Sequence, residues 1–189
     1  LGATGVICTD KTGTLTENEM RVVRWVPATN DGSPGAPIDP RSEPSAIAGP
    51  MALAALCTSA TLSDEDGRGT GDPMEIALLL FAREAGVEMA DVRGAMPEVN
   101  RVAFSRETRQ MATMHRVAEG TRVVVKGAPE AVLEGSTHTG LVASESLAAV
   151  ATNGQSTDDA DPNFERMDLD AERRAEWAAV NEELGQDGL

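Results

Sequence analysis

The chain has 189 residues, of which 41% are hydrophobic and 25% charged, and this composition is sufficient for one globular domain with its own core. Its 31 acidic and 16 basic residues give a net charge of -15, which excludes nucleic acid as a partner and argues against an anionic membrane surface. The longest apolar runs fall far short of the ~20 residues that cross a bilayer, so we expect a soluble segment without direct membrane contact. Because the chain begins at Leu1 without a methionine, we also expect it to be part of a longer protein.

The first predicted element is a short buried strand. Residues 4–9 form an apolar run that leads into the polar sequence Asp-Lys-Thr-Gly-Thr at residues 10–14. A parallel strand of this kind delivers side chains to its carboxyl end, where open α/β sheets carry their chemistry. Residues 20–26 alternate in polarity and predict a second strand, and the proline-rich residues 27–44 predict a surface loop. A helix is predicted at residues 46–56.

A second helix has clear start and stop signals. It follows a polar loop predicted at residues 63–71. Asp72 can cap the helix, Pro73 suits the first helical position, and Glu75 completes a capping-box pattern. Gly86 is expected to end the helix.

Three strands are predicted next, and two of them form a hairpin. Strands are predicted at residues 99–104, 110–117 and 121–126. The last two are expected to pair as a hairpin around residues 119–120. A short helix is predicted at residues 129–133.

The C-terminal third is predicted to be mostly loop before a final helix. Residues 136–168 are rich in Ser, Thr, Asn, Asp and Gly, with one possible helical turn at residues 147–151. Asp170 can cap the last helix, which places on one face the side chains of Trp177, Val180 and Leu184. The expected fold class is α/β, with an antiparallel sheet flanked by helices.

The polar loop after the first strand can carry phosphoryl chemistry. A carboxylate such as Asp10, at the end of a buried strand, can attack a phosphoryl group if nearby donors neutralise the phosphate oxygens. Lys11, the hydroxyls of Thr12 and Thr14, and the flexible backbone at Gly13 supply such donors, and Mg²⁺ would add positive charge. The alternative is a surface turn whose hydroxyls are satisfied locally.

The same loop resembles the aspartyl-phosphate motif of P-type cation-transporting ATPases, and residues 17–20 continue the family pattern. The resemblance implies that Asp10 is the nucleophile phosphorylated by ATP, that Lys11 and Thr14 assist at the phosphate, and that Asp10 and Thr12 bind Mg²⁺. It also implies a Rossmann-like phosphorylation domain of the haloacid-dehalogenase type. Other parts of that site lie elsewhere in the family's sequences, so we do not expect this chain alone to hydrolyse ATP.

The strand and the nucleophilic aspartate also resemble phosphatases of the wider haloacid-dehalogenase superfamily. Those enzymes usually carry a second aspartate two positions later, as a general acid and base that hydrolyses the intermediate. Here that position is Thr12. A site without the second acid lets its acyl phosphate persist, which favours a pump over a phosphatase. A non-catalytic ATP-binding module is the third class considered.

Three further segments resemble the nucleotide-binding domain of the P-type ATPases, in the family's order: Gly-Asp-Pro-Met-Glu at 71–75, Phe-Ser-Arg-Glu-Thr-Arg-Gln-Met at 104–111, and Val-Lys-Gly-Ala-Pro-Glu at 125–130. The resemblance implies that Glu75 approaches the adenine amino group. Phe104 can stack on an adenine, Glu75 can accept from its edge, and Lys126, with Gly127 beside it, can lie at the floor of the pocket.

Two arginines follow Phe104 closely and are candidates for the phosphates of ATP. Arg106 and Arg109 can bind phosphate oxygens in bidentate fashion, which supplies a local positive charge that the whole chain lacks. Arg109 stands where the family usually has lysine, so the charge is kept and the geometry differs.

Each candidate also has a structural interpretation. Glu75 could serve only as the capping-box glutamate, Phe104 as a core residue, and Arg106 and Arg109 as parts of a solvated surface. For Lys126 the structural interpretation is a surface lysine that only aids solubility, but its position between Val125 and Gly127 at the end of a strand does not suit that role. The two histidines, His115 and His138, are expected to be structural or exposed.

The sequence therefore predicts two parts: residues 1–20 begin a phosphorylation domain, and residues 21–189 form a nucleotide-binding domain. By resemblance, the ligands are ATP and Mg²⁺, and the partners are the phosphorylation, actuator and transmembrane domains of the same pump. The segment would lie at the cytoplasmic face of a membrane. Calcium is the first hypothesis for the transported cation.

Overall fold

The structure is a computed structural model that describes residues 19–42, 44–63, 68–117, 120–142 and 164–187. The predicted strand at residues 4–9, the helical turn at residues 147–151, and the loop that carries Asp10, Lys11, Thr12 and Thr14 lie outside the described residues, and the statements about them remain predictions. Within the described ranges, no helix has the length and apolar character needed to span a membrane.

A three-stranded antiparallel sheet lies at the centre of the domain. It contains β3 (Glu98–Ser105), β4 (Gln110–Val117) and β5 (Gly120–Gly127) in that order, so the three predicted strands and the hairpin pairing are confirmed. On β4, alternate side chains are buried, namely Met111, Thr113 and His115. This alternation defines one covered and one open face of the sheet.

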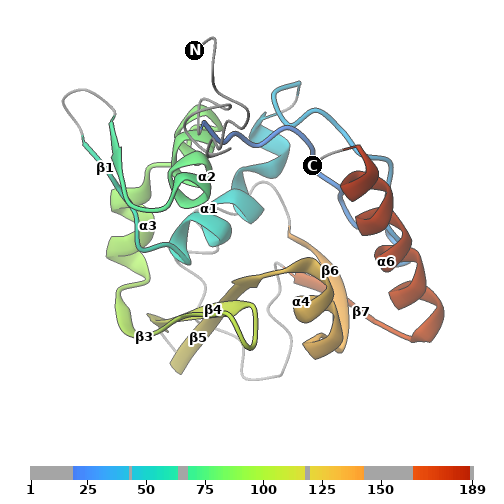
Figure 1. The fold of residues 1–189 in the computed structure, drawn as a ribbon. Coiled ribbons are helices and arrows are strands. Elements are labelled where there is room, and N and C mark those ends of the chain that lie inside the picture. The colour runs from blue at the N-terminus through green and yellow to red at the C-terminus, as the bar shows by residue number, and fades with distance from the viewer. Residues whose placement is uncertain (1–18, 43, 64–67, 118–119, 143–163, 188–189) are drawn as a thin grey trace, which may run out of the picture.

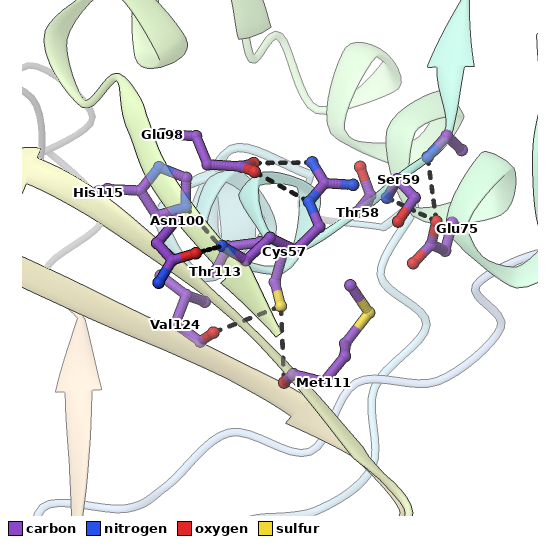
Figure 2. Close-up of polar contacts among 12 residues, drawn as sticks. Cys57, Thr58, Ser59, Glu75, Glu98, Asn100, Met111, Thr113, His115 and Val124 are labelled. Carbon is purple, nitrogen blue, oxygen red and sulfur yellow. Dashed lines mark hydrogen bonds and ion pairs between the residues drawn. The ribbon is translucent and has the colours of Figure 1, made fainter. Parts of the chain in front are cut away.

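The covered face packs against a layer of helices, which Figure 1 shows above the sheet. These helices are η1 (Pro44–Ile47), α1 (Ala48–Leu56), α2 (Pro73–Glu84) and α3 (Met89–Ala95). Side chains of the helices and their connections form the main hydrophobic core, which includes Ile47, Leu79, Phe81 and Met96. Cys57, directly after α1, reaches the sheet, where its Sγ lies 3.4 Å from the carbonyl oxygen of Val124 (Figure 2). The predicted helix at 46–56 is confirmed as η1 followed by α1.

Local signals determine both ends of α2. The side chain of Asp72 accepts from the backbone amides of Met74 and Glu75, and Pro73 is the first helical residue. At the other end Gly86 has a φ of +79°, and the amide of Val87 donates to the carbonyl of Ala82. This is the Schellman arrangement, which requires a left-handed residue after the helix. The predicted start and stop of this helix are confirmed.

The C-terminal part contains two helices and a second small sheet. Its elements are α4 (Pro129–Gly135), β6 (His138–Val142), β7 (Phe164–Asp168) and α6 (Ala171–Gln186). The prediction of loop for most of residues 136–168 is wrong at β6 and β7, which pair with each other as an antiparallel sheet. The predicted face of α6 is confirmed, since Trp177, Val180 and Leu184 are half-buried on the side near α4.

A loop from the N-terminal part of the domain closes on this C-terminal unit. The indole Nε1 of Trp177 donates to the carbonyl of Gly32 at 3.1 Å, and Nε of Arg173 donates to the carbonyl of Asp31 at 2.7 Å. A Cβ added at Gly32, whose φ is +87°, would lie 2.7 Å from the side chain of Thr139 on β6. Glycine at this position therefore allows the loop to touch β6 and α6 at once.

Two other predictions in the connecting segments need correction. The predicted strand at residues 20–26 is absent from the described structure, where only Trp25 forms a bridge, with Ile38. Residues 20–26 alternate in polarity, but no neighbouring strand pairs with this segment along its length. The polar loop predicted at residues 63–71 is in part a short strand, β2 (Gly69–Thr70), which pairs with β1 (Thr61–Leu62).

Candidate functional site

A buried ion pair joins two of the candidate residues. Lys126 lies near the end of β5 and opposite Met111 of β4, so its side chain points to the covered face of the sheet. Its Nζ donates to Oε1 of Glu75 on α2 at 2.9 Å. The two side chains are only 15% and 7% exposed. Since neither charge is well solvated, each depends on the other for compensation.

The second carboxylate oxygen of Glu75 is bound by backbone. Oε2 accepts from the amides of Ser59 at 2.7 Å and Ala60 at 3.0 Å, as Figure 2 shows for this group of polar contacts. The capping-box interpretation is thus only half right: Asp72 accepts from the Glu75 amide, but the Glu75 carboxylate turns toward residues 59–60 and Lys126. Glu75 therefore connects the α1–β1 loop, α2 and β5.

The glycine that begins the same segment is required by a close approach. Gly71 has a φ of +132°, and a Cβ added to it would lie 2.8 Å from the Cβ of Ala60. Both ends of the Gly-Asp-Pro-Met-Glu segment therefore contact the loop at residues 59–60: Gly71 by close packing and Glu75 by hydrogen bonds. This physical requirement was not visible in the sequence pattern.

Arg109 is held at a fixed place by the backbone around it. It ends the turn between β3 and β4 with a φ of +54°, and its amide donates to the carbonyl of Ser105 at 2.7 Å. Its own carbonyl accepts from the amide of Ala128 at 2.9 Å. A Cβ added at Gly127 would lie 2.3 Å from that carbonyl oxygen. Only glycine at position 127 allows the turn to lie against the β5–α4 junction.

The side chain of Arg109 forms an ion pair with Glu130, in the first turn of α4. Both side chains remain about half exposed, at 50% and 51%. The pKa of Glu130 lies below its usual range, chiefly because of a hydrogen bond from its own backbone amide and in addition because of the nearby Arg109. Glu130 is the last residue of the Val-Lys-Gly-Ala-Pro-Glu segment, and the sequence alone predicted no role for it.

Phe104 and Arg106 lie on the surface. The ring of Phe104 is 58% exposed, so the interpretation of Phe104 as a core residue is wrong. Arg106 is also exposed, and no hydrogen bond or ion pair involves its side chain in the described part of the chain. The structure therefore brings Glu75 to Lys126 and Arg109 to Gly127, and it leaves Phe104 and Arg106 open to solvent near the same turn.

A cavity of about 640 Å³ borders the β5 end of this region. Its lining is mostly apolar and comes mainly from α1, β5 and α4, with Trp25 and Trp177 on its walls. Lys126 and Gly127 line it, while Phe104 and Arg109 do not. A volume of this size is in the range of small-molecule sites.

The two histidines have the structural roles expected of them. His115 is buried, with Nδ1 3.0 Å from the carbonyl oxygen of Met96 and Nε2 2.8 Å from the hydroxyl of Thr113. Because a carbonyl only accepts, Nδ1 carries the proton in the neutral ring. His138 is 45% exposed beside Asp168. Among the described residues, no group of three or more His, Cys, Asp or Glu side chains is arranged to hold a metal, and the predicted Mg²⁺ ligands Asp10 and Thr12 lie outside them.

The fold and these segments define a helix-flanked antiparallel domain in which three separate motifs meet around Lys126 and Arg109. Residues 50–153 match the family described as P-type ATPase, cytoplasmic domain N. The chain is 32% identical over 132 residues to the calcium-transporting ATPase lmo0841 of Listeria monocytogenes, and the alignment covers 69% of this chain and 14% of that protein. It is 37% identical over 152 residues to the probable cation-transporting ATPase F of Mycobacterium tuberculosis, in an alignment that covers 71% of this chain and 17% of that protein. It is 32% identical over 153 residues to the calcium-transporting ATPase 1 of Saccharomyces cerevisiae, in an alignment that covers 72% of this chain and 16% of that protein.

The chain belongs to the P-type cation-transporting ATPases. It spans between 14% and 17% of the length of these curated relatives. Its α+β fold, with antiparallel sheets flanked by helices, agrees with the family's cytoplasmic domain N and with the fold class predicted from sequence.

Proposed function

We propose that residues 21–189 form the nucleotide-binding domain of an ATP-driven cation pump, and that residues 1–20 begin its phosphorylation domain. The observation that carries the proposal is the meeting of three sequence segments at one place: Glu75 binds Lys126, and the carbonyl of Arg109 packs on Gly127 and Ala128. In the intact pump this part would face the cytoplasm and work with the phosphorylation, actuator and transmembrane domains.

In this proposal the adenine of ATP binds beside Phe104, whose exposed ring offers a stacking surface. Lys126 supplies a donor to the base, and Glu75 holds that lysine in place. An ionised carboxylate has about four acceptor positions, and Glu75 uses three of them for Ser59, Ala60 and Lys126. The remaining position would accept a hydrogen bond from the adenine amino group. Arg106 and Arg109 bind the phosphates.

The chemical step would take place at Asp10. Its carboxylate attacks the γ-phosphorus, the bond between that phosphorus and the oxygen of ADP breaks, and an aspartyl phosphate forms. Lys11 and Thr14 bind the transferred phosphate, and Mg²⁺, held by Asp10 and Thr12, would neutralise its charge. The absence of a second acid at Thr12 would allow the phosphoenzyme to persist while the pump changes conformation. The chain alone is not expected to turn over ATP.

Calcium is the proposed cargo. The supporting observation is that two of the relatives named above are called calcium-transporting ATPases. The residues that select the ion would lie in the membrane part of the pump, so this proposal is tested by transport of the full-length protein with calcium and competing cations.

Two experiments test the proposed nucleotide role. Titration of the 189-residue chain with ATP should give saturable binding, and amide chemical shifts near Phe104 and Lys126 should move. Lys126→Ala should weaken that binding. Unchanged shifts at millimolar ATP would contradict the proposal.

The phosphorylation role is tested separately in the full-length protein with labelled ATP. An acid-stable phosphoenzyme that hydroxylamine cleaves is expected, and Asp10→Asn should abolish it while nucleotide binding stays nearly intact. If the asparagine variant still formed the phosphoenzyme, Asp10 would not be the acceptor.

A further inference from the structure

The charges around the β3–β4 turn nearly cancel one another. Arg106 and Glu107 lie exposed in this turn, and Arg109 at its end is paired with Glu130 of α4. These four side chains sum to zero charge. Deeper in the site, Lys126 is neutralised by Glu75. The place expected to receive a triphosphate therefore has little positive charge of its own, within a chain whose net charge is -15.

The backbone of Arg109 is fixed, but its side chain can change partners. The hydrogen bonds of its amide to Ser105 and of its carbonyl to Ala128, with Gly127 in close contact, hold the residue against the start of α4. The side chain of Arg109 is half exposed, and the ion pair with Glu130 uses only Nη1 of a guanidinium that has five N–H donors. An exposed ion pair of this kind contributes little to stability and opens readily.

We propose that Glu130 competes with the phosphates of the bound nucleotide for Arg109. Glu130 occupies the guanidinium while the site is free of nucleotide, and the phosphates must displace it. Glu130 thereby lowers the affinity for polyphosphates and favours their release. This inference rests on the proposed nucleotide role of Arg109. It implies that Glu130 lowers the affinity of the site more for nucleotides with more phosphates.

The competition predicts a stronger phosphate site when the carboxylate is removed. In Glu130→Gln the side chain keeps its size and loses its charge. The affinity for ATP should rise about three- to tenfold, since a unit charge a few ångströms from another in water changes a binding constant by about that factor. The gain should be smaller for ADP and AMP and absent for adenosine, which has no phosphate.

The experiment is a calorimetric titration of the 189-residue chain with ATP, ADP, AMP and adenosine. Glu134→Gln is the matched control, because Glu134 is an exposed glutamate of the same helix α4 and its replacement changes the net charge equally. It should leave ATP affinity nearly unchanged. Glu130→Asp, which restores the charge, should return the affinity toward that of the parent chain. In an Arg109→Gln background, Glu130→Gln should change ATP affinity no more than the Glu134 control does.

The outcomes separate this inference from the function on which it rests. If the parent chain binds neither ATP nor adenosine, the proposed nucleotide role fails. If Arg109→Gln weakens ATP binding but Glu130→Gln leaves it unchanged or weakens it, Glu130 does not compete for Arg109 and the inference is overturned. An equal gain in Glu134→Gln would also overturn it, because the effect would then be one of net charge. Thermal melting should show both glutamine variants folded.

Discussion

Oε1 of Glu75 accepts a hydrogen bond from Nζ of Lys126 across the interface between α2 and β5, at 2.9 Å. Among the candidate site residues that the structure describes, Glu75 and Lys126 form the one ion pair that is buried. It joins two motifs that are 51 residues apart in the sequence. A residue proposed to bind adenine is therefore also part of what holds the helix layer on the sheet.

Replacing Glu75 by glutamine should destabilise the fold. Lys126 would keep its charge in a buried place without a counter-charge, and breaking a buried pair in this way costs about 3–5 kcal/mol. Equilibrium unfolding in urea measures the loss. The control is Glu84→Gln, on the same helix, where the ion pair with Arg41 is exposed and worth about 0–1 kcal/mol. Equal losses in the two variants would show that Glu75 does not compensate Lys126.

Gly127→Ala should disturb the position of the β3–β4 turn. The new Cβ would lie 2.3 Å from the Arg109 carbonyl oxygen and 2.8 Å from Cγ of Gln110. Because the first contact is with backbone, we expect a loss of about 1–3 kcal/mol in urea unfolding, as for other overpacked sites. Gly94→Ala in α3 is the control, since nothing lies within 4 Å of its added Cβ. That variant should be neutral or slightly stabilised, and similar behaviour at both glycines would contradict the prediction.

Phe104→Ala should weaken nucleotide binding and leave the fold intact. The ring is 58% exposed, so its removal leaves no large cavity. Loss of stacking on a base is worth about 0.5–1.5 kcal/mol, which corresponds to a few-fold weaker binding of both adenosine and ATP. Val102→Ala, on the same strand and 52% exposed, is the control for an exposed apolar side chain. Unchanged adenosine binding in Phe104→Ala would exclude the ring from the site.

Salt should affect stability and nucleotide affinity in opposite directions. With a net charge of -15, like charges repel one another in the compact state, and the Debye length falls from ~30 Å at 0.01 M salt to ~3 Å at 1 M. The chain should therefore melt at a higher temperature in ~1 M KCl than in dilute buffer. Affinity for ATP should fall over the same range, because salt screens the attraction between phosphates and arginines. A melting temperature that is unchanged or lower in high salt would contradict the predicted effect of salt on stability.

Local signals explain which elements could be predicted from the sequence. Asp72, Pro73 and Gly86 act within a few residues of themselves, and the helix they delimit is found where they indicate. The strands β6 and β7 were missed because their stability comes from pairing with each other across more than twenty residues of polar sequence. The strand predicted at residues 20–26 is wrong for the converse reason, since an alternating pattern forms a strand only where a partner is available.

The sequence proposes the residues of the candidate site, but it does not predict the contacts between them. The matched segments identified Glu75, Lys126 and Gly127, whose neighbours the structure now describes. That the Glu75 carboxylate binds the amides of Ser59 and Ala60 depends on how α1 and α2 pack. That Glu130 faces Arg109 depends on the left-handed backbone at Arg109 and the close approach at Gly127, and neither is encoded in residue spacing.

The loop that touches α6 has a consequence for how the domain opens. The carbonyls of Asp31 and Gly32 accept from Arg173 and Trp177, so two hydrogen bonds join a loop near the start of the described chain to α6 near its end. Figure 1 shows this N-terminal segment in blue beside α6 in red. Because of these two hydrogen bonds, α6 cannot separate from the domain unless its contacts with the loop at residues 31–32 also break. Amide hydrogens in β6 and β7 should then exchange with solvent in the same cooperative event as the amide of Gly32, although more than a hundred residues separate them along the chain.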